Sequence, residues 1–291
     1  MAYGSLLMSY GNVTREHDMC ELFAMSASEP TDVNHSLALL RPRGGELGPH
    51  ADGWGVAFYE DRAARVFKEP VPAAESRCLK FIADYDFQST MVIAHIRRAN
   101  PERVGRASAN THPFEREWNG RSWVFAHNGI LPGVREDEFA IGRFRPLGET
   151  DSEHAFCVLL EAIAVAHAHA RTGPSANAIV ETIRPIVNRL AELGEFNFVL
   201  GNGESLVVHA HTNLHALRRS CRMDGCRREV VLLATSPLTD EPWVQLPAGS
   251  LHVYAHGREL AYSARSGRGH HTRESRRSGD GVFSVQNREL Q

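Results

Sequence analysis

The sequence predicts an α+β fold in which helices cover layered sheets. Short apolar segments typical of strands dominate the first part of the chain, two long helical patterns follow in the middle, and strand patterns return towards the end. Several of the strand segments are apolar at consecutive positions, which is typical of strands that are buried on both faces. Such strands need a layer on each side, so we expect helices to pack against sheets.

The first half of this pattern is mostly strand. Asp32 or Asn34 can cap a short helix that continues to residue 40, and a second, amphipathic helix is predicted at 74–84. A glycine-rich turn leads into a strand within 48–59, and a charged turn joins it to a partner strand as a hairpin. Strands are predicted at 20–27, within 48–59, and at 64–68, 91–96 and 121–127.

The second half begins with two helices. Thr150-Asp151-Ser152-Glu153 has the spacing of a capping box, in which the Thr and Glu side chains satisfy unpaired N–H groups reciprocally. A second helix is expected to start at Ser175 and to end at Gly194. Further strands are predicted at 196–200, 205–210, 229–234, 251–256 and 259–262.

The chain divides into one domain with a segment on either side. Residues 20–262 show no internal repeat and no linker, so they are expected to form a single domain. Residues 1–19 are polar and lack periodicity, and we interpret them as an N-terminal extension or a mis-assigned start that is removed in the active form. Residues 263–291 are rich in Arg, Gly, Ser and His, which predicts a disordered polar tail.

Composition excludes several classes of function. A net charge of -3 and a pI near 6.6 give no electrostatic case for binding nucleic acid or an anionic membrane. No apolar run approaches the roughly 20 residues that span a bilayer, and the start lacks the pattern of a signal peptide. The five cysteines are odd in number and scattered, which favours a reducing, cytoplasmic setting.

Cys20 is the candidate nucleophile. If it became the first residue of the mature chain, its thiol could attack a carbonyl while its own α-amino group served as the base. Taken alone, a cysteine among small and apolar residues is more often a buried hydrophobic side chain than a catalytic one. The motifs downstream favour the catalytic interpretation.

Two predicted strands end on polar clusters. Arg97 ends one of them, and its planar guanidinium suits a substrate carboxylate. Asn128 and Gly129 end the other, where a side-chain amide and a backbone N–H could stabilise an oxyanion. Each cluster also has a simpler explanation, since Asn-Gly is a common turn and an Arg often pairs with a nearby acid. Asp151 at a helix start could complement the helix dipole, hold a substrate ammonium, or do both.

The sixteen histidines raise the question of a metal site. His50, His95, His112 and His127 are far apart in the sequence and could converge only through the fold. The pair Cys221 and Cys226 lacks a second half-site, so it is a weak zinc signal. We therefore predict no metal and no cofactor, with a metallohydrolase as an alternative.

The motifs together resemble the class II glutamine amidotransferases, in particular their stand-alone bacterial branch, which is often called YafJ-like. The matching segments occur in the family's order and extend over residues 20–262. They are Met19-Cys20-Glu21-Leu22-Phe23, 48–59 with Asp52-Gly53-Trp54-Gly55, 94–100, Asn110-Thr111-His112-Pro113-Phe114, Ala126-His127-Asn128-Gly129, 148–153 and Phe196-Asn197-Phe198.

This resemblance implies a fold and a set of roles. The fold would be the N-terminal-nucleophile hydrolase fold, a four-layer αββα sandwich of two stacked antiparallel sheets. Cys20 would be the nucleophile, Asn128 and Gly129 would form the oxyanion hole, Arg97 would bind the α-carboxylate of glutamine, and Asp151 would hold its α-ammonium. His112 and Asn110 would line or support the glutamine pocket.

The implied function is hydrolysis of glutamine to glutamate and ammonia, with the ammonia passing to a partner protein if there is an acceptor. An alternative within the same family is a γ-glutamyl amide hydrolase that acts on a small metabolite, as in the ergothioneine pathway. A non-catalytic glutamine-binding protein would need fewer of these residues, and we rank it below both enzymes.

Overall fold

The computed structural model describes residues 20–99, 104–170, 173–223 and 226–263. The predicted extension at 1–19 lies outside the described residues, as does the predicted tail apart from Ser263, the last residue of a strand. Within the described ranges, no helix has both the length and the apolar character that crossing a membrane requires.

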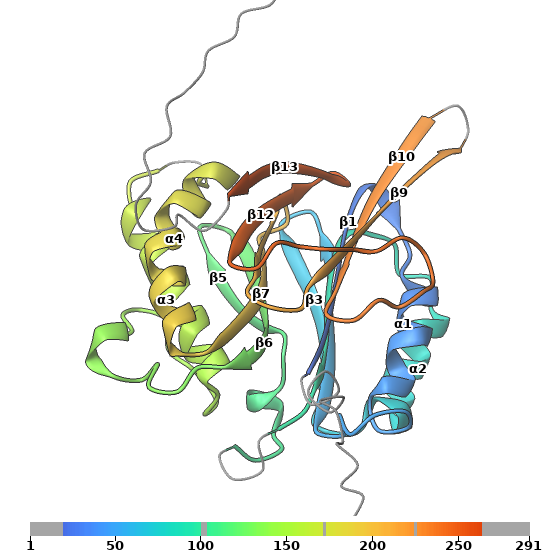
Figure 1. Ribbon diagram of the computed structural model, residues 1–291, viewed down its shortest axis with the longest axis horizontal. Helices are drawn as coiled ribbons and strands as arrows, with labels where there is room; N and C mark the ends of the chain where they lie inside the picture. Colours follow the sequence, from blue (N-terminus) through green and yellow to red (C-terminus); the bar gives the residue numbers. More distant parts are fainter. Residues whose placement is uncertain (1–19, 100–103, 171–172, 224–225, 264–291) are drawn as a thin grey trace, which may run out of the picture.

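Two antiparallel sheets are stacked at the centre of the molecule (Figure 1). The described strands of the first sheet are β1 (Glu21–Thr31), β2 (Gly53–Glu60), β3 (Ala63–Glu69), β4 (Ser89–Arg97), β9 (His215–Met223), β10 (Cys226–Ala234) and β11 (Val244–Gln245). They are ordered β11-β9-β10-β1-β4-β2-β3. The second sheet contains β5 (Phe114–Trp118), β6 (Arg121–Ile130), β7 (Glu195–Gly201), β8 (Leu206–Ala210), β12 (Ser250–Ala255) and β13 (Arg258–Ser263). Its order is β13-β12-β8-β7-β6-β5.

Helices cover the outer face of each sheet (Figure 1). Helices α1 (Asn34–Leu40) and α2 (Arg77–Asp84) pack on the first sheet, while α3 (Asp151–Ala166) and α4 (Ala176–Leu193) pack on the second. Short 3-10 helices lie at η1 (Arg41–Arg43), η2 (Ala73–Glu75), η3 (Ser108–Asn110) and η4 (Asp137–Phe139). This arrangement confirms the predicted αββα sandwich.

Strand β1 shows why its residues are apolar at consecutive positions. Phe23 and Met25 point towards α1 and α2, whereas Leu22 and Ala24 point into the core between the two sheets. Since successive strand residues alternate between faces, a strand buried on both faces has no polar side. The same alternation decides which side chains can reach the end of the inter-sheet space.

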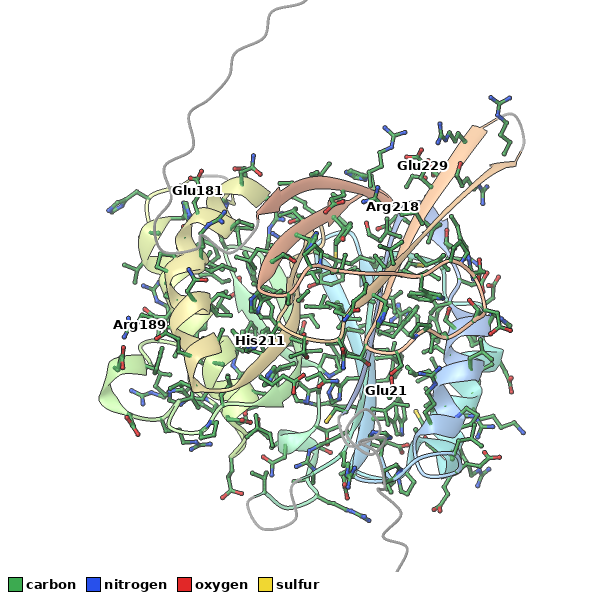
Figure 2. The ribbon with its side chains drawn as sticks, in the orientation of Figure 1. Glu21, Glu181, Arg189, His211, Arg218 and Glu229 are labelled. Carbon is green, nitrogen blue, oxygen red and sulfur yellow. The ribbon has the colours of Figure 1, made fainter. Side chains whose placement is uncertain are left out.

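Three of the described strands were not predicted: β11, which has only two residues, and two longer strands, β5 and β9. Phe114–Trp118 is short and carries three charged residues, and His215–Met223 contains three arginines, so neither segment shows a clear apolar alternation. The second of these pairs with β10 in a hairpin that extends beyond the body of the molecule (Figure 1). Arg218 and Glu229 lie on this hairpin, whereas Glu21 lies near the other end of the first sheet (Figure 2).

Helix starts differ from the predictions in detail. The Thr150 hydroxyl accepts the N–H of Glu153 at 3.1 Å, as a capping box requires. The reciprocal bond was predicted wrongly, because the Glu153 carboxylate binds Arg116 and the N–H groups of Leu147 and Gly148 instead. The second predicted helix starts three residues later than expected, at Arg77, because the Ser76 hydroxyl caps it.

The first helix also lacks the predicted side-chain cap. Val33 occupies its N-cap position and makes no capping hydrogen bond through its side chain. Asn34 is the first helical residue, and its N–H donates to the Asp32 carboxylate at 3.1 Å. Asp32 therefore pairs one amide of the first turn from just outside the helix.

Candidate active site

Cys20 lies at the end of the space between the two sheets. It directly precedes β1, and continuing the alternation of Ala24 and Leu22 places it on the inter-sheet face. Its Sγ accepts a hydrogen bond from the N–H of Arg98 at 3.2 Å and lies 3.4 Å from the Arg98 carbonyl oxygen. The thiol is therefore held against the end of β4.

Burial keeps this thiol protonated. Desolvation raises the pKa of Cys20 to about 11, although the Arg98 N–H and the Arg97 charge favour the thiolate. A cysteine with this pKa carries very little thiolate at neutral pH, and the thiolate is the nucleophile. Cys20 therefore needs a base close by if it is to attack a carbonyl.

Arg97 follows the inter-sheet residues Met91 and Ile93 of β4 at even spacing, so it also points into the inter-sheet space. Its side chain donates to the Asp52 carbonyl oxygen at 3.4 Å and to the Val104 carbonyl oxygen at 3.3 Å. Burial lowers the pKa of its guanidinium, but an arginine remains charged in proteins. Arg97 thus places a positive charge beside Cys20.

Asp52, from the Asp-Gly-Trp-Gly motif, fixes the segment that follows Arg97. Its carboxylate accepts the N–H of Ala99 at 2.8 Å and the Nε–H of Arg106 at 2.7 Å. Gly55 of the same motif allows another close approach, since a Cβ at this position would lie 2.2 Å from the carbonyl oxygen of His112. The motif therefore organises two segments of the site.

Asn128 and Gly129 were predicted to end a strand, and they lie within the last three residues of β6, which continues to Ile130. The Nδ2 of Asn128 donates to the backbone oxygen of Cys20, and its buried Oδ1 has no hydrogen-bond partner among the described atoms. Gly129 has a φ of 146°, and a Cβ there would lie 1.8 Å from the carbonyl oxygen of Glu195. Only glycine fits at this position.

Asp151 is the first residue of α3 and is half-buried. One carboxylate oxygen accepts the N–H of Leu131 at 2.6 Å, and the other accepts the N–H of Ser152 at 2.8 Å. The first bond ties the helix start to the segment that follows β6. Asp151 therefore has the structural role expected at a helix start and also places a negative charge in the site.

Three histidines from distant parts of the sequence converge beneath the site. The rings of His95 and His112 lie 4.1 Å apart between centroids, and both ring nitrogens of His112 lack a partner among the described residues. His95 Nε2 lies 3.1 Å from the His127 carbonyl oxygen, and His127 Nδ1 lies 2.8 Å from Ser152 Oγ.

These three rings are neutral at neutral pH. Burial is the main cause that lowers the pKa of His95 to about 3, that of His112 to well below its usual value, and that of His127 in the same direction. The convergence does not make a metal site. Within the described parts of the chain, no group of three or more His, Cys, Asp or Glu side chains is arranged to hold a metal ion.

Asn110 does not line the cavity that Cys20, Arg97 and Asp151 share. Its Nδ2 donates to the Gly105 carbonyl oxygen at 3.1 Å, and its Oδ1 accepts the N–H of Glu149 at 2.8 Å. It thus joins the segment after β4 to the segment that precedes Asp151. Of the two roles expected for Asn110, this geometry corresponds to support of the pocket.

A cavity of about 460 Å³ joins these groups. Cys20, Arg97, His112, Gly129 and Asp151 all line it, although they come from widely separated parts of the sequence. Asn128 lines a separate cavity that also reaches Cys20. The first cavity therefore places a cation, an anion and a thiol where one small zwitterionic ligand could contact all three.

His127 also lines this cavity, as do Arg98 and Ile130. From the sequence, His127 was expected only as a possible metal ligand, and Arg98 and Ile130 had no expected role. His127 directly precedes Asn128, and this position could have indicated its place in the site.

Comparison with known proteins gives a consistent result. Residues 19–278 match the family of class II glutamine amidotransferases. YafJ of Escherichia coli, named as a glutamine amidotransferase, is 39% identical over 260 residues, which cover 83% of this chain and 100% of that protein. The γ-glutamyl-hercynylcysteine sulfoxide hydrolase of Mycobacterium tuberculosis is 26% identical over 199 residues, covering 68% of this chain and 72% of that protein.

A solved structure extends the likeness to three dimensions. The predicted glutamine amidotransferase of Pseudomonas aeruginosa is 29% identical and superposes with a TM-score of 0.59, covering 84% of this chain and 99% of the other. The sandwich of two antiparallel sheets, the family match and the similarity to YafJ lead to one conclusion. This chain belongs to the class II glutamine amidotransferases.

Proposed function

We propose that the protein hydrolyses the γ-amide of glutamine through a thioester on Cys20. The observation that supports this function is the shared cavity in which Arg97 and Asp151 place opposite charges near the thiol. A free amino acid carries a carboxylate and an ammonium group. Arg97 would bind the carboxylate and Asp151 the ammonium, which would leave the γ-amide to reach Cys20.

Activation of Cys20 would depend on its own α-amino group. The thiol is protonated at neutral pH because burial raises its pKa to about 11. A free α-amine has a pKa of roughly 7.7–8.0 and can take this proton. The mechanism therefore requires that the residues before Cys20 are removed, as proposed for 1–19.

The thiolate sulfur would form a bond to the amide carbon. The backbone N–H of Gly129 would stabilise the resulting oxyanion. The side-chain Nδ2 of Asn128 carries two hydrogens, and the one that is not donated to the Cys20 backbone oxygen would be the second donor. The C–N bond would then break, and the nitrogen would take the proton from the Cys20 ammonium and leave as ammonia. Water would cleave the thioester to give glutamate, and the ammonia could serve a partner protein.

A second candidate function is hydrolysis of a substituted γ-glutamyl amide. The hydrolase of Mycobacterium tuberculosis, whose name specifies such a substrate, supports it. The nucleophile and the glutamyl contacts would be the same, and only the leaving amine would differ. His112 would contribute to the glutamyl pocket and Asn110 would support it in both cases.

The test compares a chain that starts at Cys20 with one that starts at Met1. Each is offered glutamine and a panel of γ-glutamyl amides, and glutamate release is measured. We expect glutamate from the chain that starts at Cys20, none from the chain that retains Met1, and none from a folded Cys20→Ala variant. Full activity in Cys20→Ala would contradict the assignment of the nucleophile, and full activity with Met1 retained would contradict the amine as base.

A further inference from the structure

Cys20 also lies on a second cavity. This cavity has a volume of about 350 Å³. Cys20 is the one described residue that lines both it and the cavity of about 460 Å³ with Arg97 and Asp151, here called the glutamyl cavity. Asn128, which hydrogen bonds to the Cys20 backbone oxygen, lines the second cavity. The nucleophilic residue therefore separates two spaces that share no other described wall.

The walls of the second cavity are polar and partly acidic. The Glu21 carboxylate accepts the Thr235 hydroxyl at 3.0 Å and lies 3.4 Å from Arg43, which is not itself part of the lining. The Glu195 carboxylate accepts the Nδ2 of Asn197 at 3.1 Å and also the Thr212 hydroxyl. None of the described residues that line this cavity is Lys or Arg, whereas three arginines line the glutamyl cavity.

Its size exceeds what ammonia needs. A water molecule occupies about 30 Å³ in the liquid, and ammonia is of similar size. The second cavity has about ten times this space and falls in the range of small-molecule pockets. A polar molecule with several heavy atoms would fit it.

We propose that the second cavity binds the amine portion of a substituted γ-glutamyl amide, and that this amine is polar and neutral or cationic. This inference rests on the proposed function, because the γ-glutamyl portion would occupy the cavity with Arg97 and Asp151. The amide carbon would then lie at Cys20, between the two cavities. The carboxylate of Glu195 favours a cation over an anion, whereas the charge of Glu21 is offset by its ion pair with Arg43.

The reaction keeps the steps given above with a larger leaving group. The Cys20 sulfur bonds to the amide carbon, and the C–N bond breaks. The departing nitrogen takes the proton from the Cys20 ammonium and leaves as a primary amine into the second cavity. Water then cleaves the thioester and releases glutamate.

The test uses the chain that starts at Cys20 and three substrates besides glutamine. These are the γ-glutamyl amide of a diamine, which is cationic, that of ethylamine, which is neutral, and γ-glutamylglycine, which is anionic. We expect kcat/KM to be about ten-fold higher for the diamine amide than for glutamine, and lowest for γ-glutamylglycine among the substituted amides. Glutamate release is the measurement for all four.

Three variants test whether this preference arises from the second cavity. Gln245 and Val244 are exposed neighbours on β11, but Gln245 lines the cavity and Val244 does not. We expect Gln245→Trp to lower kcat/KM for the diamine amide about ten-fold more than for glutamine, and Val244→Trp to change neither. Glu195→Gln should reduce the preference for the diamine amide over the ethylamine amide.

Three outcomes would overturn the proposal. Faster turnover of glutamine than of every substituted amide is one, and an equal effect of Gln245→Trp on all substrates is another. The third is the absence of turnover of any substrate, together with a Cys20 that is not labelled by an electrophilic glutamine analogue. This third result would contradict the proposed function as well, whereas the first two would leave the glutaminase intact.

Discussion

The carbonyl oxygen of Glu195 lies where a side chain on Gly129 would have to begin. A Cβ on Gly129 would be 1.8 Å from this oxygen, well inside the contact distance of two heavy atoms. The two residues lie on neighbouring strands, with Gly129 paired to Phe196. The close approach of β6 and β7 at this point therefore depends on the absence of a side chain.

Substitution of this glycine should damage the site. We expect Gly129→Ala to push β6 away from β7 and to displace the proposed oxyanion donor, with a loss of about 10² to 10³ in kcat. Glutaminase activity and thermal unfolding of the variant would be measured together. Gly120→Ala is the matched control, because Gly120 also has a positive φ, of 72°, but its Cβ would meet nothing within 4 Å. Equal loss of activity in both variants would contradict this explanation.

The charge of Asp151 should matter only for substrates with an α-ammonium group. We expect Asp151→Asn to lower kcat/KM for glutamine by roughly 10- to 100-fold, since hydrogen bonds to charged groups contribute about 1.5–3 kcal/mol. The desamino analogue of glutamine, which lacks the α-ammonium, should be turned over almost equally by the variant and the parent. If the variant loses activity on both substrates equally, then Asp151 acts by holding Leu131 and the start of α3.

Acid should destabilise the protein through the buried histidines. The pKa of His95 is lowered to about 3 in the folded protein. Below about pH 6.5, His95 therefore binds a proton in the unfolded chain but not in the folded one. Stability is therefore lost as the pH falls from about 6.5, by roughly 1.4 kcal/mol per pH unit for each such histidine. Urea unfolding at pH values between 7.5 and 4.5 would measure this slope.

His112→Phe separates the contribution of one ring. The ring nitrogens of His112 make no hydrogen bond to the described residues, so phenylalanine loses none, and the slope should become shallower by about 1.4 kcal/mol per pH unit. His169→Phe is the control, because His169 is exposed after the end of α3. An unchanged slope in His112→Phe would show that folding does not lower the pKa of His112.

Glu153 should contribute far more to the stability of the protein than Glu161, which lies on the same helix. Its carboxylate is 1% exposed and pairs with Arg116 at 2.6 Å, so Glu153→Ala leaves a buried charge without its partner. We expect a loss of about 3–5 kcal/mol in the free energy of unfolding. Glu161→Ala removes the more exposed pair with Arg143 and should cost about 0.2–1 kcal/mol. Chemical denaturation of both variants provides the comparison, and similar losses would contradict it.

The order of strands and helices could be predicted because the apolar pattern of each is local. Leu22, Phe23, Ala24 and Met25 are apolar without a break, and the structure shows that each face of β1 meets a different core. The arginine-rich strand β9 could not be predicted from its own pattern. Its place in the sheet is secured by pairing with β10, which is a property of two segments and not of one.

Much of the site was indicated by residue type, whereas the contacts within it were not. Arg97 and Asp151 were expected to bind substrate, and they do lie on one cavity with Cys20. The role of Glu195 as the backbone neighbour of Gly129 could not be seen, because it comes from a carbonyl group that every residue has. The contact between the tilted rings of His95 and His112 likewise depends on where the segment before β5 meets β4.

The position of β1 within its sheet has a consequence for the order of synthesis. Its neighbour on one side is β4, and its neighbour on the other is β10, which ends at Ala234. Because a chain is made from its N-terminus, β1 must wait until most of the protein has been translated before both of its edges are paired. The thiol carried at its start therefore remains without its complete surroundings throughout that interval. The environment proposed to activate Cys20 is in this sense complete only when the polypeptide is.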